Sequence, residues 1–268
     1  MNTSKPLRLL VVTAHPADAF DNAAGTIAAH VGRGDHVEIV SVTHGARSHA
    51  PNVYDDVQEG LDERSERSLL EKTIEKKREE FEKAAQVLGV QRTHFLAEDD
   101  EPFMDSRQAA LDLAEVYRKA RPDILITHHP TERNHPDHPL VGELSLRCVT
   151  TAARWLEGSQ LAPYLISTVY FYGVQSRRDA TLVDAAIRLP ATHVVDITRV
   201  IEKKKTALSC FASQKYQGAA YDTPEYMNRR IESLEGYWGL INEFRYAEEF
   251  IARQPHRLQS LPISRCLA

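Results

Sequence analysis

The stretch Arg8-Leu9-Leu10-Val11-Val12-Thr13-Ala14-His15-Pro16-Ala17-Asp18 carries the main clue to the fold. Its first half is a short apolar run rich in β-branched residues, which is typical of a buried strand. A histidine and an aspartate, His15 and Asp18, follow this run three residues apart. Both side chains are therefore expected just beyond the carboxyl end of a strand, where open α/β sheets bind their ligands.

A second apolar run ends in a similar way. Asp123-Ile124-Leu125-Ile126-Thr127 leads into His128-His129, and then into Asn134-His135-Pro136-Asp137-His138-Pro139. Zinc and similar divalent metals bind imidazole nitrogen and carboxylate oxygen, and a catalytic site keeps three protein ligands and one open position. His15, Asp18 and His138 would supply such a set. We therefore interpret the two stretches as the two halves of one metal site.

Strand-like and helix-like segments alternate along the rest of the chain. Strands are predicted at 9–13, 37–42, 93–96, 124–127, 168–171 and 193–195, and helices at 22–33, 65–88, 107–120, 140–156, 198–213 and 224–238. Asp21 or Asn22 is expected to cap the first helix, Gly34 and Gly89 to end the first two, and residues 46–60 to form a loop. The alternation predicts an α/β fold in one domain, residues 1–268, with a mainly parallel sheet and helices on both faces.

Two common sites are absent from the sequence. The first strand–helix turn lacks Gly-x-Gly-x-x-Gly, so a dinucleotide site is not expected. There is also no Gly-x-Ser-x-Gly segment, so a serine-hydrolase nucleophile has no support.

Composition limits the partners and the compartment. The 268 residues are 42% hydrophobic and carry a net charge of −5, so no nucleic-acid partner is expected. No apolar stretch approaches the ~20 residues of a membrane span. The N-terminus lacks the apolar core of a signal peptide, and three scattered cysteines, Cys148, Cys210 and Cys266, fit a reducing cytoplasm. We expect a cytoplasmic protein that acts on a small-molecule substrate. A homo-oligomer is possible, and the sequence leaves the oligomeric state open.

The two metal stretches also resemble a known family. Ala14-His15-Pro16-Ala17-Asp18, followed by Ala24-Gly25, resembles the opening of the PIG-L/LmbE family, whose usual form is Ala-His-Pro-Asp-Asp. His135-Pro136-Asp137-His138 matches its second motif. Weaker matches follow in the same order at 84–85, 88–90, 196–198, 213–214 and 246–248. The resemblance therefore spans nearly the whole chain.

The resemblance implies a Rossmann-like fold and a chemistry. Members of the family are mostly zinc-dependent hydrolases that remove acyl groups from amino sugars and related amides. The resemblance places zinc, or another divalent metal, on His15, Asp18 and His138. It also suggests that His135 stabilises an oxyanion and that Asp137 tunes or orients that group. Deacetylase-type hydrolysis of an amide or ester of a small polar substrate is therefore the leading expectation.

Ala17 departs from the family pattern. The family has an aspartate here, the usual general base, and a methyl group cannot take a proton from water. A positioned base typically contributes ~10²–10⁴-fold to the rate. A smaller branch, resembling 4-oxalomesaconate hydratases, also lacks this aspartate, and it resembles this chain in Cys210-Phe211-Ala212-Ser213-Gln214. The acid expected in that branch after the second strand would fall near Ala46, so it is missing too.

Three functions therefore stay open: metal-dependent hydrolysis, addition of water to an unsaturated carboxylic acid, and metal binding without catalysis. His44, after the second predicted strand, is the first candidate for a general base because its neutral imidazole can accept a proton near pH 7. Further candidates with weaker arguments are His49, His128, the acidic run 99–101 and Arg47, each of which also fits an ordinary structural or solvated role.

Overall fold

The computed structural model describes residues 5–48, 62–132, 135–156, 158–172, 191–214 and 223–254. The predicted loop beyond residue 48, with His49, and Cys266 lie outside these ranges. No helix in the described ranges is both long and apolar enough to cross a membrane.

A seven-stranded sheet forms the middle of the fold, with the strand order β3-β2-β1-β4-β5-β7-β6. The strands are β1 (Arg8–Thr13), β2 (His36–Thr43), β3 (Arg92–Glu98), β4 (Ile124–His128), β5 (Thr168–Tyr172), β6 (His193–Asp196) and β7 (Ala247–Ala252). Strands β1 to β5 pair in parallel, whereas β7 runs antiparallel to both β5 and β6. The predicted α/β, Rossmann-like architecture with a mainly parallel sheet is confirmed.

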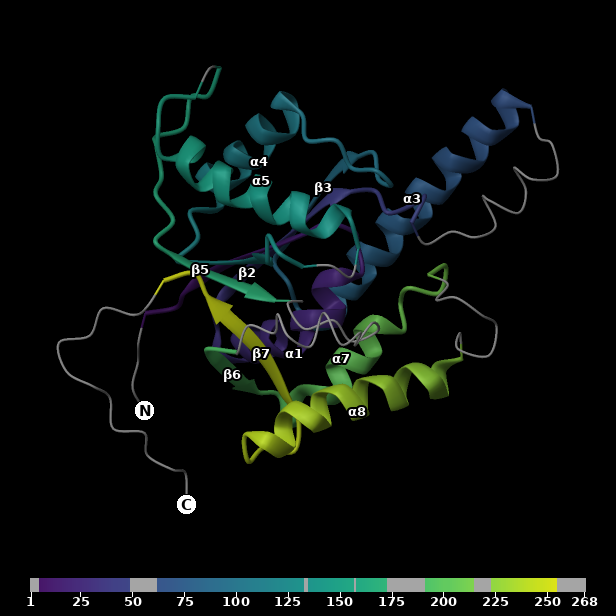
Figure 1. Ribbon diagram of the computed structural model, residues 1–268, viewed down its shortest axis with the longest axis vertical. Helices are drawn as coiled ribbons and strands as arrows, with labels where there is room; N and C mark the ends of the chain where they lie inside the picture. The colour runs from purple at the N-terminus through teal and green to yellow at the C-terminus, as the bar shows by residue number, and fades with distance from the viewer. Residues whose placement is uncertain are drawn as a thin grey trace.

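Helices cover both faces of this sheet (Figure 1). One layer packs on Leu9 and Val11 of β1, and it contains α1 (Asp18–Arg33), α3 (Glu63–Leu88), α7 (Ile201–Leu208) and α8 (Pro224–Ile241). The other layer packs on Leu10 and Val12 and contains α4 (Arg107–Ala120) and α5 (Asp137–Ala152). Successive residues of a strand point to opposite faces. The continuous apolar run of β1 therefore supplies both layers.

The strand order creates a crevice at one place. The chain leaves β1 for β2 on one side, and it later returns to place β4 on the other side of β1. The connections that follow β1 and β4 thus depart toward opposite faces. The carboxyl ends of two such strands form the usual ligand-binding crevice of an open parallel sheet. Both histidine-containing stretches begin at this point.

Three helices begin earlier than the sequence predicts; α3 begins two residues earlier, at Glu63, and the differences in α1 and α5 concern this crevice. Helix α1 begins at Asp18 rather than after Asp21, because the backbone N–H of Asp18 already bonds to the His15 carbonyl in a tight turn. Helix α5 begins at Asp137 rather than at Leu140. Pro139 fits in its first turn because a helix does not use that N–H group.

The predicted helix 198–213 is also shorter in the structure. A 3-10 turn, η1 (Thr198–Val200), precedes α7, which ends at Leu208. The glycine ends of the first two helices are confirmed: Gly34 and Gly89 both adopt the left-handed backbone conformation, with φ of 92° and 80°.

Strand β7 was not predicted, and it holds α1 in place. The Glu248 carboxylate accepts hydrogen bonds from the backbone N–H groups of Gly25 and Thr26 in the middle of α1, at 2.9 and 2.7 Å. The Lys204 ammonium donates to the same carboxylate at 2.6 Å, and Lys204 and Glu248 are both fully buried. The position of α1 therefore depends on a buried charge near the other end of the described chain.

Gly142 sets the distance between α5 and the end of β4. A Cβ atom at this position would lie 2.5 Å from the His128 carbonyl oxygen, which is closer than any real contact. Only glycine therefore allows α5 to lie this close to the histidine that ends β4.

We predict that Gly142→Ala lowers the free energy of unfolding by about 1–3 kcal/mol, the usual cost of overpacking. The matched control is Gly32→Ala at an exposed position of α1, where an added Cβ meets nothing within 4 Å. That change should instead raise stability by roughly 0.5–1 kcal/mol. Urea unfolding of both variants measures the difference, and equal stabilities would contradict the packing argument.

Candidate metal centre

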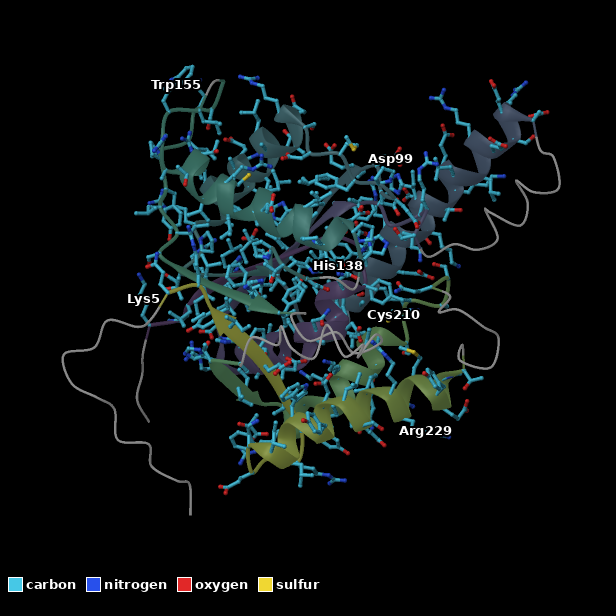
Figure 2. The ribbon with its side chains drawn as sticks, in the orientation of Figure 1. Lys5, Asp99, His138, Trp155, Cys210 and Arg229 are labelled. Atoms are coloured by element: carbon cyan, nitrogen blue, oxygen red, sulfur yellow. The ribbon has the colours of Figure 1, made fainter. Side chains whose placement is uncertain are left out.

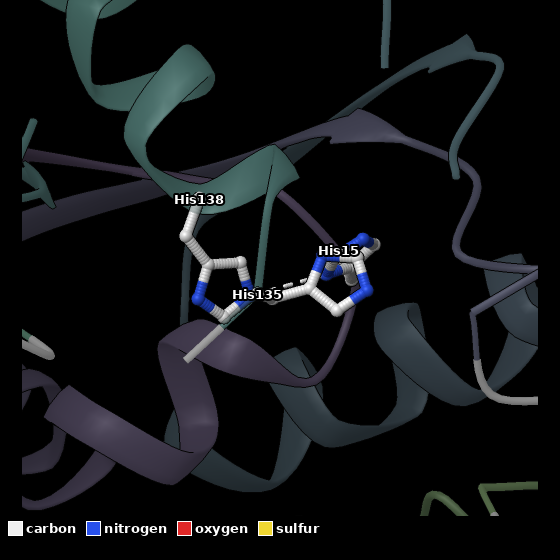
Figure 3. A group of neighbouring side chains, drawn as sticks. All are labelled: His15, His135 and His138. Carbon is white, nitrogen blue, oxygen red and sulfur yellow. Dashed lines mark hydrogen bonds between the residues drawn. The ribbon is translucent and has the colours of Figure 1, made fainter. Parts of the chain in front are cut away.

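Side chains from both stretches meet in the crevice between β1 and β4. His15 follows β1, His135 lies just before α5, and His138 lies in its first turn (Figure 3). The ring centroid of His15 lies 4.5 Å from that of His135 and 5.3 Å from that of His138. In Figure 2, His138 lies near the middle of the molecule. The structure thus brings together the two halves that the sequence predicts.

Three of these donor atoms form a nearly equilateral triangle. His15 Nδ1 lies 3.2 Å from Asp18 Oδ2 and 3.3 Å from His138 Nε2. Asp18 Oδ2 lies 3.3 Å from His138 Nε2. Two ligands of a tetrahedral zinc ion with bonds of about 2.0–2.1 Å are separated by roughly 3.3 Å. The predicted set His15, Asp18 and His138 therefore has the spacing of three corners of a zinc tetrahedron.

A second carboxylate stands behind each imidazole of the triangle. Asp137 Oδ2 lies 3.2 Å from His15 Nε2, and Glu132 Oε1 lies 2.6 Å from His138 Nδ1. Asp137 is held in turn by the backbone N–H groups of Glu101 and Phe103, at 3.0 and 2.8 Å. Histidines that bind a metal through one nitrogen usually donate the other N–H to a carboxylate. The outer nitrogens of both imidazoles therefore also have the carboxylate partners that are typical of a metal site.

The buried carboxylates around the triangle favour a positive charge at its centre. Burial alone would lower the pKa of His15, but the charge of Asp18 and the hydrogen bonds to Asp137 and Asp18 together raise this pKa to about 9. Burial also opposes ionisation of Glu132, yet the facing imidazoles of His138 and His128 hold its pKa near 2. Asp18 is held well below its ordinary pKa in the same way. This buried cluster therefore favours positive charge, which a metal ion would supply.

His135 lies beside the triangle as a neutral imidazole. Burial and the nearby His15 and His138 charges lower its pKa to about 4. Its Nδ1 accepts a hydrogen bond from the backbone N–H of Asp137 at 3.3 Å, so the ring proton is on Nε2. A ring nitrogen of His135 lies within 4.8 Å of ligating nitrogens of His15 and His138. The residue can therefore donate a hydrogen bond to a ligand at the centre.

Asp137 has its closest imidazole contact with His15 and not with His135. The distance from Asp137 Oδ2 to His135 Nδ1 is 3.9 Å, compared with 3.2 Å to His15. The sequence suggests that Asp137 orients His135. In the structure, the backbone of Asp137 contacts His135, and its carboxylate orients His15.

His44 belongs to a neighbouring cluster. Its two ring nitrogens lie 2.7 Å from Asp100 and 3.0 Å from Asp99. Asp100 Oδ2 accepts the Ser48 hydroxyl at 2.6 Å, and Ser48 Oγ lies 3.2 Å from His15 Nε2. His44 therefore reaches the centre through Asp100 and Ser48. Asp99 faces outward near α3 (Figure 2), where Arg47 donates to it.

The two positions where the family resemblance leads us to expect an acid hold alanine. Ala17 and Ala46 are both buried, with exposed fractions of 2% and 0%. A methyl group at either place offers no group that can transfer a proton.

Lys77 is a buried cation on α3 that the sequence did not single out. Its side chain is 1% exposed, and its Nζ has no hydrogen-bond partner among the described residues. Burial lowers its pKa to about 8, and the charges of Glu80 and Asp100 oppose that shift. One turn further along the helix, Phe81 packs against Phe20 near the start of α1. Lys77 therefore lies on the side of α3 that faces the crevice region.

Glu132 and Ser48 were also not predicted. A carboxylate in the short connection between two histidine motifs was a usable signal, because metal-binding histidines need such partners. Ser48 carried no signal, since its contact with His15 depends on how the β2 end folds back. His128, a candidate from the sequence, is buried, and its Nδ1 lies 2.8 Å from Glu132 Oε2.

Comparison with known proteins identifies the family of the chain. Residues 10–149, more than half of the chain, match the PIG-L family, described as GlcNAc-PI de-N-acetylase. The chain is 27% identical to 4-oxalmesaconate hydratase of Pseudomonas putida, over 81% of this chain and 77% of that protein. It is 25% identical to diacetylchitobiose deacetylase of Thermococcus kodakarensis, over 90% and 81%.

Solved structures show the same fold. The 4-carboxy-2-hydroxymuconate hydratase of Pseudomonas putida superposes with a TM-score of 0.74 at 24% identity, covering 96% of this chain and all of that one. The N,N'-diacetylchitobiose deacetylase of Pyrococcus horikoshii superposes with a TM-score of 0.69 at 23% identity, covering 92% and 84%. With its two metal motifs joined at one crevice, and a family match over more than half of its length, the chain belongs to the PIG-L family.

Proposed function

We propose that the protein is a zinc-dependent hydratase that adds water to a carbon–carbon double bond of an unsaturated carboxylic acid. The observation that carries this proposal is Ala17, a buried methyl group where deacetylases of the family place their base. The similarity to 4-oxalmesaconate hydratase supports it. Deacetylase-type hydrolysis, the leading expectation from the sequence, becomes the second candidate, favoured by the 25% identity to a deacetylase.

In this proposal His15, Asp18 and His138 hold the zinc ion, with Asp137 and Glu132 orienting the two imidazoles. When bound, zinc would lower the pKa of a water molecule and polarise an oxygen of the substrate. Water adds so that its hydroxyl joins one alkene carbon and its proton joins the other. Negative charge meanwhile builds on the oxygens conjugated with the double bond.

His135 is suited to stabilise that charge. Because it is neutral and carries its proton on Nε2, it can donate a hydrogen bond without first gaining a proton. A preorganised donor in a water-poor site typically contributes ~10²–10³-fold to kcat. His44 stays the first candidate for proton transfer, and Asp137, whose carboxylate contacts His15, is the second. His44 would act over the Asp100–Ser48 connection, and Asp137 directly beside His15.

Lys77 supports an acidic substrate. Asp100 and Glu80 help to keep its ammonium charged, yet each accepts its own hydrogen bonds from Ser48 and Ser213. Among the described residues, no group accepts a hydrogen bond from the buried Nζ of Lys77. Burying an ammonium without a partner is costly. A substrate carboxylate would satisfy the charge and offset that cost.

The reaction type is tested by turnover on a small panel. With 4-oxalmesaconate we expect loss of the absorbance of the conjugated system, and with diacetylchitobiose no release of acetate.

Ala17→Asp should leave hydration unimproved or reduce it, because a second anion would crowd the site and repel an acidic substrate. Increased acetate release by Ala17→Asp would support the hydrolase instead. An unchanged hydration rate in His44→Ala would remove His44 as the base, and no turnover in any variant would favour a binding protein.

The ligand set is tested by metal content. Wild type should bind about one zinc ion per chain, and His138→Ala should lose it because one corner of the triangle is gone. His135→Ala should keep the metal and lose turnover, since three other residues complete the set. Elemental analysis measures the metal. Equal loss of zinc in both variants would make His135 a ligand.

Lys77→Met should raise KM for the acidic substrate by about 10–100-fold, because hydrogen bonds to charged groups contribute about 1.5–3 kcal/mol. Lys76→Met, which removes the adjacent exposed charge of the same helix, should leave KM unchanged. The free energy of unfolding of Lys77→Met should stay equal or rise, because an unbonded buried charge is removed. If stability falls and KM does not change, Lys77 only balances Asp100 and Glu80.

A further inference from the structure

We propose that His128 and Glu132 are positioning residues that join the end of β1 to the first turn of α5 and fix which nitrogen of His138 faces the metal. The connection runs from the Ala14 backbone through His128 and Glu132 to His138, and we call it the Ala14–His138 strut. The inference rests on the ligand set proposed above but not on the reaction type.

The hydrogen bonds of His128 determine its proton. The backbone N–H of Ala14 donates to His128 Nε2 at 3.1 Å, so this nitrogen carries a lone pair and no proton. The proton is therefore on Nδ1, which lies 2.8 Å from Glu132 Oε2 and donates to it. The ring is fully buried and stacks on His138, with ring centroids 4.1 Å apart. Both nitrogens of His128 are thus in use within the protein.

This arrangement decides between alternative ligand sets. Asp18, His128 and His138 also place one donor atom each within 4.8 Å of one another, and His128 Nε2 lies 3.4 Å from Asp18 Oδ2. Binding a metal through His128 Nε2 would require breaking its bond to the Ala14 N–H, which is buried beside β1. A buried backbone donor without a partner costs about 1–3 kcal/mol. His128 therefore supports the centre instead of binding the metal.

Glu132 transmits the constraint to His138. Its Oε2 is taken by His128, and its Oε1 lies 2.6 Å from His138 Nδ1. Because the carboxylate can only accept, His138 Nδ1 carries a proton, and Nε2 is the nitrogen left to bind a metal. Nε2 faces Asp18 Oδ2 and His15 Nδ1 at 3.3 Å each. The two oxygens of Glu132 thus link His128, which is bonded to the Ala14 backbone, to His138 in the first turn of α5.

Zinc affinity, measured by competition with a chelator, tests the strut without any turnover. In Glu132→Gln only one of the two imidazole N–H groups keeps an acceptor, so affinity should fall about 10–100-fold, as for other partners of metal-binding histidines. Glu143→Gln, which removes an exposed carboxylate from the same helix α5, should match wild type. His128→Phe should lose a similar factor while still binding one zinc ion.

The two residues should also be coupled. The double variant Glu132→Gln/His128→Phe should lose no more affinity than the weaker-binding single variant, because both changes break one connection. Glu132→Asp keeps the charge but is one methylene shorter, so it should also bind zinc more weakly. The absorption bands of the cobalt(II)-substituted protein should shift in Glu132→Gln and not in Glu143→Gln.

Four results would overturn the proposal. They are wild-type affinity in Glu132→Gln, complete loss of zinc in His128→Phe as in His138→Ala, full recovery in Glu132→Asp, and losses that multiply in the double variant. If wild type binds no zinc, the ligand set and the strut fail together. If wild type binds zinc and hydrates nothing, the strut stands and only the proposed reaction fails.

Discussion

The metal centre depends on one topological constraint, the placement of β2 and β4 on opposite sides of β1. Chain leaving β1 enters α1 on one face, and chain leaving β4 enters α5 on the other. The backbone cannot fill the space between two departing connections, so side chains at the strand ends face each other across it. His15 and His138, 123 residues apart, meet there for this reason. A shift of either strand by one residue would turn the chain that follows it toward the wrong face.

The charges in the crevice are arranged in layers. Asp18 contributes its carboxylate directly to the triangle, and Asp137 and Glu132 stand behind the imidazoles. Each outer carboxylate fixes the proton of one ring, so the inward nitrogen keeps its lone pair for a cation. Separating these tasks also explains Ala17. The triangle uses no atom of residue 17, so an alanine there leaves the three donors in place.

Much of this could be predicted from the sequence, because it depends on local patterns. The apolar runs predicted β1, β2 and β4 to within one residue at each end, and Gly34 and Gly89 ended their helices as expected. The motifs predicted the three donors of the triangle. The remaining features depend on contacts between distant segments. Asp18 begins a helix because its turn binds His15, and nothing local marks Lys77 as buried. The partner of Asp137 follows from packing, which brings His15 closer to it than the neighbouring His135.

The contact between Glu248 and α1 has a consequence for the order in which the protein is made. All proposed ligands lie between residues 15 and 138, whereas the carboxylate that binds the Gly25 and Thr26 amides arrives more than a hundred residues later. Chains grow at about 5–20 residues per second and fold from their N-terminus. The carboxylate that anchors α1 is therefore made several seconds after the last proposed ligand. Until then, the contact between β7 and α1 cannot form.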